Sequence, residues 1–123
     1  MKAVDQYSLH PPFVYQLYCS VIKNKKDYSY FKEIEEIRKT IHKDVTLINI
    51  QDYGSGSRSS KKTQRKAKDI AKSGLSSPKF SKLLYKLVDH FNPTTVLELG
   101  TSLGINSLYL SSHNPQIKVY TFE

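Results

Sequence analysis

The chain has 123 residues and a formal net charge of +8 at pH 7, with 19 Lys and Arg against 11 Asp and Glu. This length fits one small domain and is short for most α/β enzymes that bind a nucleotide-like cofactor. One cysteine excludes an internal disulfide framework, no apolar run is long enough to span a membrane, and the four histidines have no metal-ligand spacing. We therefore expect a cytoplasmic protein without a metal site.

Residues 1–57 are predicted to form a helical extension that ends in a glycine- and serine-rich loop. Pro11 and Pro12 can begin a first helix, because the first turn of a helix needs no N–H donors. Ser29 is the expected N-cap of a second, amphipathic helix. Residues 45–50 are predicted to be a strand or an extended linker, and residues 52–57 to be a lid over a ligand or a plain connection.

Residues 58–93 are predicted to hold two helices that precede an α/β core. The first, from about Ser59 to Ser73, would be strongly basic, with Gly74 as the first residue after the helix. The second would begin with Ser77 as its N-cap and would end at Asn92 and Pro93.

The positive charge is concentrated between residues 58 and 72, where Asp69 is the only acid. The basic residues there are Arg58, Lys61, Lys62, Arg65, Lys66, Lys68 and Lys72. They form either a solvated helix face or a phosphate-binding patch. No aromatic residue is interleaved to stack on nucleic-acid bases, so charge alone does not decide between these interpretations.

Residues 94–123 differ in character and predict a βαβ unit. A strand over 95–99, a glycine turn over 100–104, a helix over 105–112 and a strand over 117–122 follow one another within about 30 residues. The two strands should be parallel and the crossover right-handed.

Three residues of this unit have the chemistry of a ribose-binding site. Gly100 lets the backbone bend sharply and approach a ligand, and Gly104 opens the helix beside the turn. Glu123 follows the second strand, 19 residues after Gly104. An acid about 20 residues beyond a glycine turn is typical of ribose recognition, because its carboxylate accepts hydrogen bonds from both hydroxyls.

The turn does not match the phosphate-binding patterns. A dinucleotide fingerprint that started at Gly100 would need glycine at positions 102 and 105, where the chain has Ser102 and Ile105, and the P-loop pattern is also missing. Glu98 would repel a diphosphate and would suit a cationic ligand that carries an ammonium and a sulfonium. The sequence therefore favours a ribose-linked cation over a dinucleotide.

At this point the sequence resembles a known family. The segments VLELGTSLGINSLYL at 96–110 and VYTFE at 119–123 are similar to the first motif and the following acid of class I S-adenosylmethionine-dependent methyltransferases, in the O-methyltransferase-like branch. The common family pattern has glycine where Ser102 stands. The resemblance implies that Glu98 contacts the methionine ammonium of the cofactor and that Glu123 holds the ribose diol. It also implies that the backbone of the turn lines the cofactor, with Gly100, Thr101, Ser102 and Gly104 as the contacting residues.

The resemblance further implies the fold class and the activity. We expect an α/β fold in which N-terminal helices precede the first βαβ unit of a Rossmann-like sheet. The chain would be the N-terminal portion of a methyltransferase that acts on a small-molecule acceptor, with no transfer activity of its own and no assigned catalytic residue. Its open sheet edges would favour pairing between chains. The alternatives are a basic nucleic-acid-binding module at 58–72 and a non-catalytic helical interaction domain.

Overall fold

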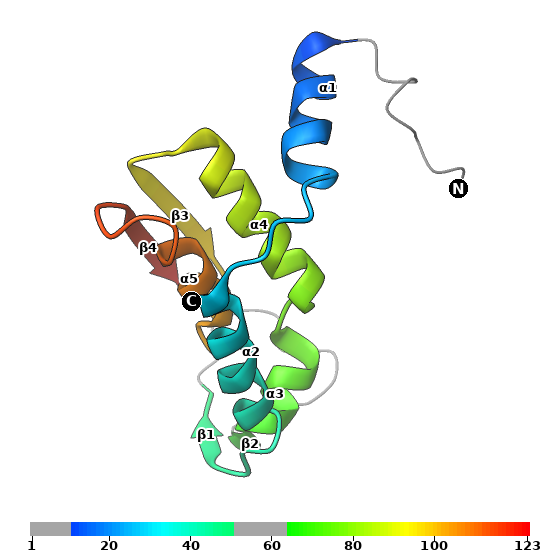
Figure 1. Cartoon of the computed structure of the whole chain (residues 1–123). Helices are drawn as coiled ribbons and strands as arrows, with labels where there is room; N and C mark the ends of the chain where they lie inside the picture. The colour runs from blue at the N-terminus through cyan, green and yellow to red at the C-terminus, as the bar shows by residue number, and fades with distance from the viewer. Residues whose placement is uncertain (1–10, 51–63) are drawn as a thin grey trace.

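The computed structural model describes residues 11–50 and 64–123, which form a mixed α/β structure with two sheets of two strands each (Figure 1). Residues 52–57, predicted to be a lid or a plain connection, and residues 58–63 of the basic stretch lie outside the described residues. In chain order the elements are α1 (Pro12–Leu17), the π-helix η2 (Tyr18–Ile22), α2 (Ser29–Ile41), β1 (Leu47–Asn49), β2 (Gln64–Lys66), α3 (Ala67–Gly74), α4 (Pro78–Phe91), β3 (Thr95–Leu99), α5 (Ile105–Ser111) and β4 (Lys118–Phe122).

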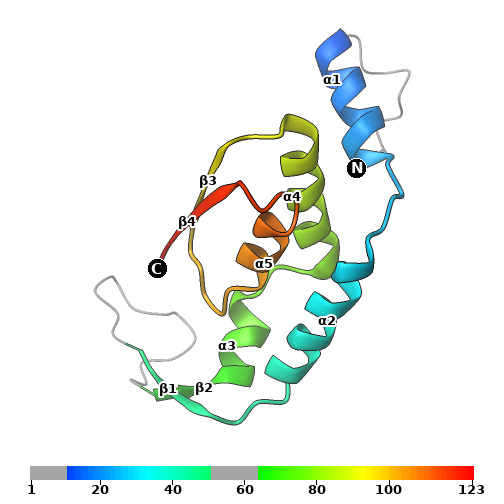
Figure 2. The same cartoon turned by 60° about the vertical axis from the view of Figure 1, so that its left-hand side comes forward.

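The helix α1 leads away from the body of the molecule, and η2, which continues it, anchors this segment to the rest of the structure (Figures 1 and 2). α1 begins at Pro12 as predicted and continues into η2, where Val21 is fully buried. Ser20 lies within hydrogen-bond distance of His90 near the end of α4. The apolar residues at helical spacing therefore dock this segment on the C-terminal end of α4.

The predicted Ser29 cap is wrong by one residue. Tyr28 occupies the N-cap position and makes no side-chain cap hydrogen bond, and Ser29 is the first helical residue. The Tyr28 ring packs edge-on against Phe31 with 5.2 Å between the ring centroids, and its hydroxyl donates to Asp89. Aromatic packing, and not a serine hydroxyl, holds the start of α2.

The core lies where α2, α4 and α5 meet. It consists of buried side chains from all three helices, namely Phe31, Ile34, Tyr85, Ile105 and Tyr109. The helix α5 also packs against β4, so that it lies between the β3–β4 pair and α2 (Figure 2). Aromatic rings supply much of the buried area, which offsets the small number of buried aliphatic residues.

The segment predicted as one basic helix divides into a strand and a shorter helix. Residues 64–66 form β2, which pairs antiparallel with β1, and the helix α3 begins only at Ala67. The pairing continues past the strand, because the Ala67 N–H donates to the Thr46 carbonyl at 2.9 Å. Gly74 is the last residue of α3 and not the first residue after it. Within the β-branched run at 45–50, Leu47–Asn49 thus form a strand because they pair with β2, which is not adjacent to them in sequence.

The helix α4 has the ends that its sequence predicts. The Ser77 side chain accepts from the Phe80 N–H, Pro78 is the first helical residue, and Asn92 adopts a left-handed conformation with φ 43° as the C-cap. A side-chain acceptor and an early proline are typical helix starts, and asparagine tolerates the left-handed region better than most residues.

The strands β3 and β4 are parallel, as predicted, and their register runs from Thr95 opposite Lys118 to Leu99 opposite Phe122. Helix α5 follows β3 and precedes β4. Because strand side chains alternate, this pair has two faces. One carries the half-buried Val96 and the buried Glu98, and the other is exposed.

None of the described helices is long and apolar enough to cross a membrane.

Candidate ligand-binding site

The turn after β3 has an unusual backbone. Gly100, Ser102 and Gly104 all have positive φ, at 89°, 50° and 75°. Glycine adopts this region without a Cβ penalty, whereas a serine there is strained by about 1–2 kcal/mol. The turn is tied to the second strand, because the N–H groups of Gly100 and Thr101 both donate to the Phe122 carbonyl, at 2.8 and 3.2 Å.

Glu123 meets this turn directly. Its carboxylate Oε2 accepts from the Ser102 backbone N–H at 2.6 Å, across 21 residues of sequence. The register of the parallel strands explains the contact. Leu99 at the end of β3 lies opposite Phe122 at the end of β4, so the turn that follows β3 lies beside Glu123, which follows β4. Glu123 is exposed, and its carboxylate can accept further hydrogen bonds. The structure therefore brings together the turn and the acid, as predicted.

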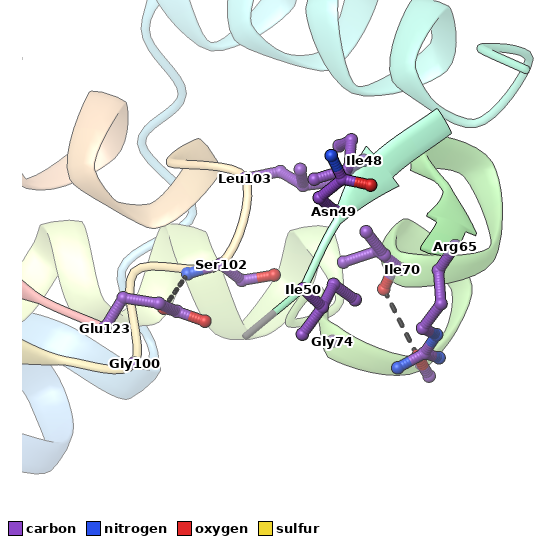
Figure 3. Close-up of a pocket in the computed structure, with 11 residues that line it drawn as sticks. Ile48, Asn49, Ile50, Arg65, Ile70, Gly74, Gly100, Ser102, Leu103 and Glu123 are labelled. Atoms are coloured by element: carbon purple, nitrogen blue, oxygen red, sulfur yellow. Dashed lines mark hydrogen bonds between the residues drawn. The ribbon is translucent and has the colours of Figure 1, made fainter. Parts of the chain in front are cut away.

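A cavity of about 780 Å³ opens beside this contact. Figure 3 shows its two walls. The turn and the acid form one wall, with Gly100, Ser102, Leu103 and Glu123. The β1–β2 hairpin, the residue after β1 and the C-terminal half of α3 form the other wall, with Ile48, Asn49, Ile50, Arg65, Ile70, Ser73 and Gly74. The volume lies in the range of small-molecule sites.

Sequence reasoning missed this second wall. The run at 45–50 had the β-branched composition of a strand, but its partner β2 was assigned to a helix, so nothing placed it near the turn. Gly74 was read as a helix end only. A Cβ built on Gly74 would lie 3.0 Å from the Ser102 Oγ, so a glycine at this position lets α3 approach the turn closely.

Glu98 lies in a different cavity from Glu123. Its side chain is buried with 8% exposure, and the Ser107 hydroxyl on α5 donates to its Oε2. This second cavity, of about 400 Å³, is lined by residues of α4, β3 and α5 together with Gly74, Ser76 and Gly100. The two cavities share Gly74 and Gly100. Of the other predicted residues, Thr101 and Gly104 shape the turn but line neither cavity.

The charges that line the two cavities are few. Arg65 and Glu123 line the larger cavity, and Glu98 lines the smaller one. Within residues 11–50 and 64–123, no group of three or more His, Cys, Asp or Glu side chains could hold a metal ion. Both glutamates offer carboxylate acceptors: exposed Glu123 can accept from vicinal hydroxyls, and buried Glu98 can accept from a cationic donor.

The basic stretch does not form one continuous helix face. Among its described members, Arg65 lines the larger cavity, whereas Lys66 and Lys72 are exposed. The nucleic-acid interpretation of residues 58–72 stays a prediction.

Comparison of the chain with models of protein families, with curated proteins and with solved structures finds no match.

Proposed function

We propose that the chain is the N-terminal portion of an S-adenosylmethionine-dependent methyltransferase of class I and that it carries part of the cofactor site. The observation that carries this proposal is the 2.6 Å contact between the Ser102 N–H and the Glu123 carboxylate at the edge of a cavity. A left-handed glycine turn and an acid at the end of the neighbouring parallel strand are the two parts that a ribose-binding α/β site needs.

Three of the predicted residues, Glu123, Gly100 and Glu98, have positions that support a role in binding the cofactor. Glu123 would accept from the ribose hydroxyls, with its carboxylate already oriented by Ser102. Gly100, which lines both cavities, would let the ligand cross the backbone without a Cβ in the way. Glu98 would hold the methionine ammonium on the other side of Gly100, where Ser107 keeps the carboxylate in place. When bound, the cofactor supplies a methyl group on a sulfonium, ready for transfer to a nucleophile.

The acceptor that we propose is a small molecule. The larger cavity has room for one beside the ribose site, and its lining is mostly aliphatic or small. No described residue is assigned as a catalytic base, so we expect little or no methyl transfer by these 123 residues alone. Incubation with a radiolabelled cofactor and a panel of phenols and carboxylic acids would detect any turnover.

The Rossmann-like interpretation of the sheet is part of the same proposal. Support comes from the parallel β3–β4 pair, whose two strands are connected along the chain by α5. It also comes from the exposed apolar face of that pair. Parallel sheets of α/β proteins are normally covered by helices on both faces, and a helix here covers only one face of the pair.

Isothermal titration calorimetry with S-adenosylhomocysteine tests the proposed function. Wild type should bind, and Glu123→Ala should bind roughly 10- to 100-fold more weakly, because hydrogen bonds to a charged acceptor are lost. Glu33→Ala, which removes an exposed glutamate from α2, is the matched control and should bind like wild type. Absence of binding to wild type, or equal binding by Glu123→Ala, would reject the proposal and favour a non-catalytic helical interaction domain.

A further inference from the structure

Arg65 lies on the wall of the larger cavity opposite the wall that holds Glu123 (Figure 3). It is the middle residue of β2 and pairs with Ile48 of β1, which also lines the cavity. Because strand side chains alternate, Gln64 and Lys66 lie on the opposite face of the hairpin, where both are exposed. The strand β2 therefore presents Arg65 to the cavity and leaves Gln64 and Lys66 outside, while β1 contributes Ile48 and Asn49 to the lining.

The guanidinium of Arg65 has few partners among the described residues. Its Nη2 donates to the Ser73 Oγ at 3.2 Å, and within the described ranges no carboxylate forms an ion pair with it. The Ser73 hydroxyl is itself within hydrogen-bond distance of the Asp69 and Ile70 carbonyls. A guanidinium has five N–H donors in a planar fork, so most of these donors have no acceptor among the described residues.

The surroundings of Arg65 make an anion the expected partner. Aliphatic side chains line the cavity around it, namely Ile48, Ile50, Ile70 and Leu103. Glu123, the other charged residue of the lining, accepts from the Ser102 N–H. Arg65 is half-buried, and its guanidinium fork matches a carboxylate in a bidentate way.

We propose that Arg65 binds a carboxylate on a ligand of this cavity, the rest of which is apolar and contacts the isoleucines. The inference rests on the proposed function for the identity of the ligand, which is a methyl acceptor that carries a carboxylate. The cofactor's own carboxylate shares a carbon with the ammonium that we assign to Glu98 in the other cavity, so we do not expect it at Arg65. A purely structural role is the competing explanation, since a cation near the C-terminal end of α3 also stabilises the helix.

The first arm of the test asks about the cofactor. Binding of S-adenosylhomocysteine and of adenosine, which lacks the carboxylate, is measured by calorimetry on wild type, Arg65→Ala and Lys66→Ala. Lys66 is the matched control, because it is the next residue of the same strand, carries the same charge and is exposed. If the cofactor supplies the carboxylate, Arg65→Ala weakens S-adenosylhomocysteine roughly 10- to 100-fold and leaves adenosine unchanged.

The second arm asks about a second ligand. Benzoate and its uncharged isostere benzamide are titrated into the same variants, with and without saturating S-adenosylhomocysteine. If the acceptor supplies the carboxylate, Arg65→Ala weakens benzoate roughly 10- to 100-fold, while benzamide binding and the Lys66→Ala variant are unaffected. Arg65→Lys should recover part of the affinity, because the charge returns without the bidentate fork.

The outcomes separate this inference from the proposed function. Binding of benzoate that depends on Arg65, without any binding of S-adenosylhomocysteine, supports the anion site and rejects the methyltransferase. The inference is overturned if neither carboxylate probe binds wild type. It is also overturned if Arg65→Ala binds both probes like wild type, or if it loses charged and uncharged probes equally together with a lower melting temperature.

Discussion

At residue 100 the backbone conformation favours glycine, whereas the available space does not require it. Gly100 has φ 89°, yet no atom lies within 4 Å of a Cβ built on it. A larger side chain would therefore meet no clash and would pay only the conformational cost of the left-handed region. This separates Gly100 from Gly74, where the built Cβ lies 3.0 Å from the Ser102 Oγ.

Gly100→Ala is expected to lower the free energy of unfolding by about 1–2 kcal/mol, through backbone strain alone. Urea denaturation followed by circular dichroism measures the change. Ser102→Gly, which relieves a left-handed serine in the same turn, is the companion variant and should not be destabilised by a comparable amount. Loss of stability in Ser102→Gly as large as in Gly100→Ala would show that contacts, and not backbone conformation, determine the effect.

At this scale the sequence allowed the turn and Glu123 to be predicted, because both follow from local signals. Glycine at 100 and 104 and an acid at the end of a strand are visible without knowledge of the fold. Arg65 and Gly74 could not be placed in the same way, since their position in the cavity depends on a hairpin whose strands are far apart in sequence.

At the scale of elements, α2 is joined to α4 by a buried arginine. Arg38 is 5% exposed, and its guanidinium donates to Glu35, to the Ser76 carbonyl and to the Ser81 hydroxyl. Ser81 continues the network by donating to Asn106 of α5 at 2.7 Å. A buried charge is tolerated only where its partners are complete, so this network determines how the helices meet.

Arg38→Met should lower the free energy of unfolding by about 3 kcal/mol, because it leaves buried acceptors of the network without their donor. Lys39→Met is the matched control, since Lys39 pairs with Glu36 on the exposed surface and its removal should leave stability unchanged. Thermal and urea unfolding of both variants test the difference. Equal effects of the two substitutions would contradict a structural role for the buried network.

Two core tyrosines make the free energy of unfolding depend on pH. Burial raises the pKa of Tyr85 above its ordinary value of 10.0, and its hydrogen bond with Tyr30 raises it further. Burial likewise raises the pKa of Tyr109, with a further contribution from its hydrogen bond to Glu35. The unfolded chain ionises these groups first, so the stability that they contribute is complete below about pH 10 and is lost as the pH rises above it.

The unfolding free energy should therefore fall in alkaline solution, by up to about 1.4 kcal/mol per pH unit for each tyrosine. Tyr109→Phe should reduce that slope by the contribution of one proton, although it also removes one hydrogen bond at neutral pH. Urea titrations at several values between about pH 9 and 11 give the slope. An unchanged slope in Tyr109→Phe would mean that this hydroxyl titrates equally in both states.

Prediction of the elements succeeded where local periodicity and capping agree, as in α4, and failed where pairing at long range competes. Residues 64–66 have the composition of a basic helix, but they pair as a strand with β1. Tertiary pairing of this kind overrides helix propensity, which is a weak preference for each residue.

At the scale of the whole molecule, the parallel β3–β4 pair has an exposed apolar face. Leu97, Leu99, Tyr120 and Phe122 are 67%, 85%, 51% and 54% exposed. The register places Leu97 opposite Tyr120 and Leu99 opposite Phe122, so the four side chains lie together on one side of the strands. Alternation within the strands could be predicted from sequence, but which face α5 covers depends on the packing of the helix.

Such a face should cause the chain to self-associate, because a contiguous apolar patch on a short parallel sheet is covered in stable proteins. Light scattering coupled to size exclusion is expected to show dimers or larger species whose fraction grows with concentration. Leu99→Glu should shift the distribution toward monomer with little change in melting temperature, because a side chain that is 85% exposed makes few contacts within its own chain.

The control for that shift is Ile37→Glu, which places the same charge on an exposed apolar residue of α2, away from the sheet. It should leave the association unchanged. A wild-type chain that stays monomeric at high concentration would contradict the prediction outright. Equal loss of association in both variants would instead trace it to net charge, since each substitution lowers a charge of +8 by one.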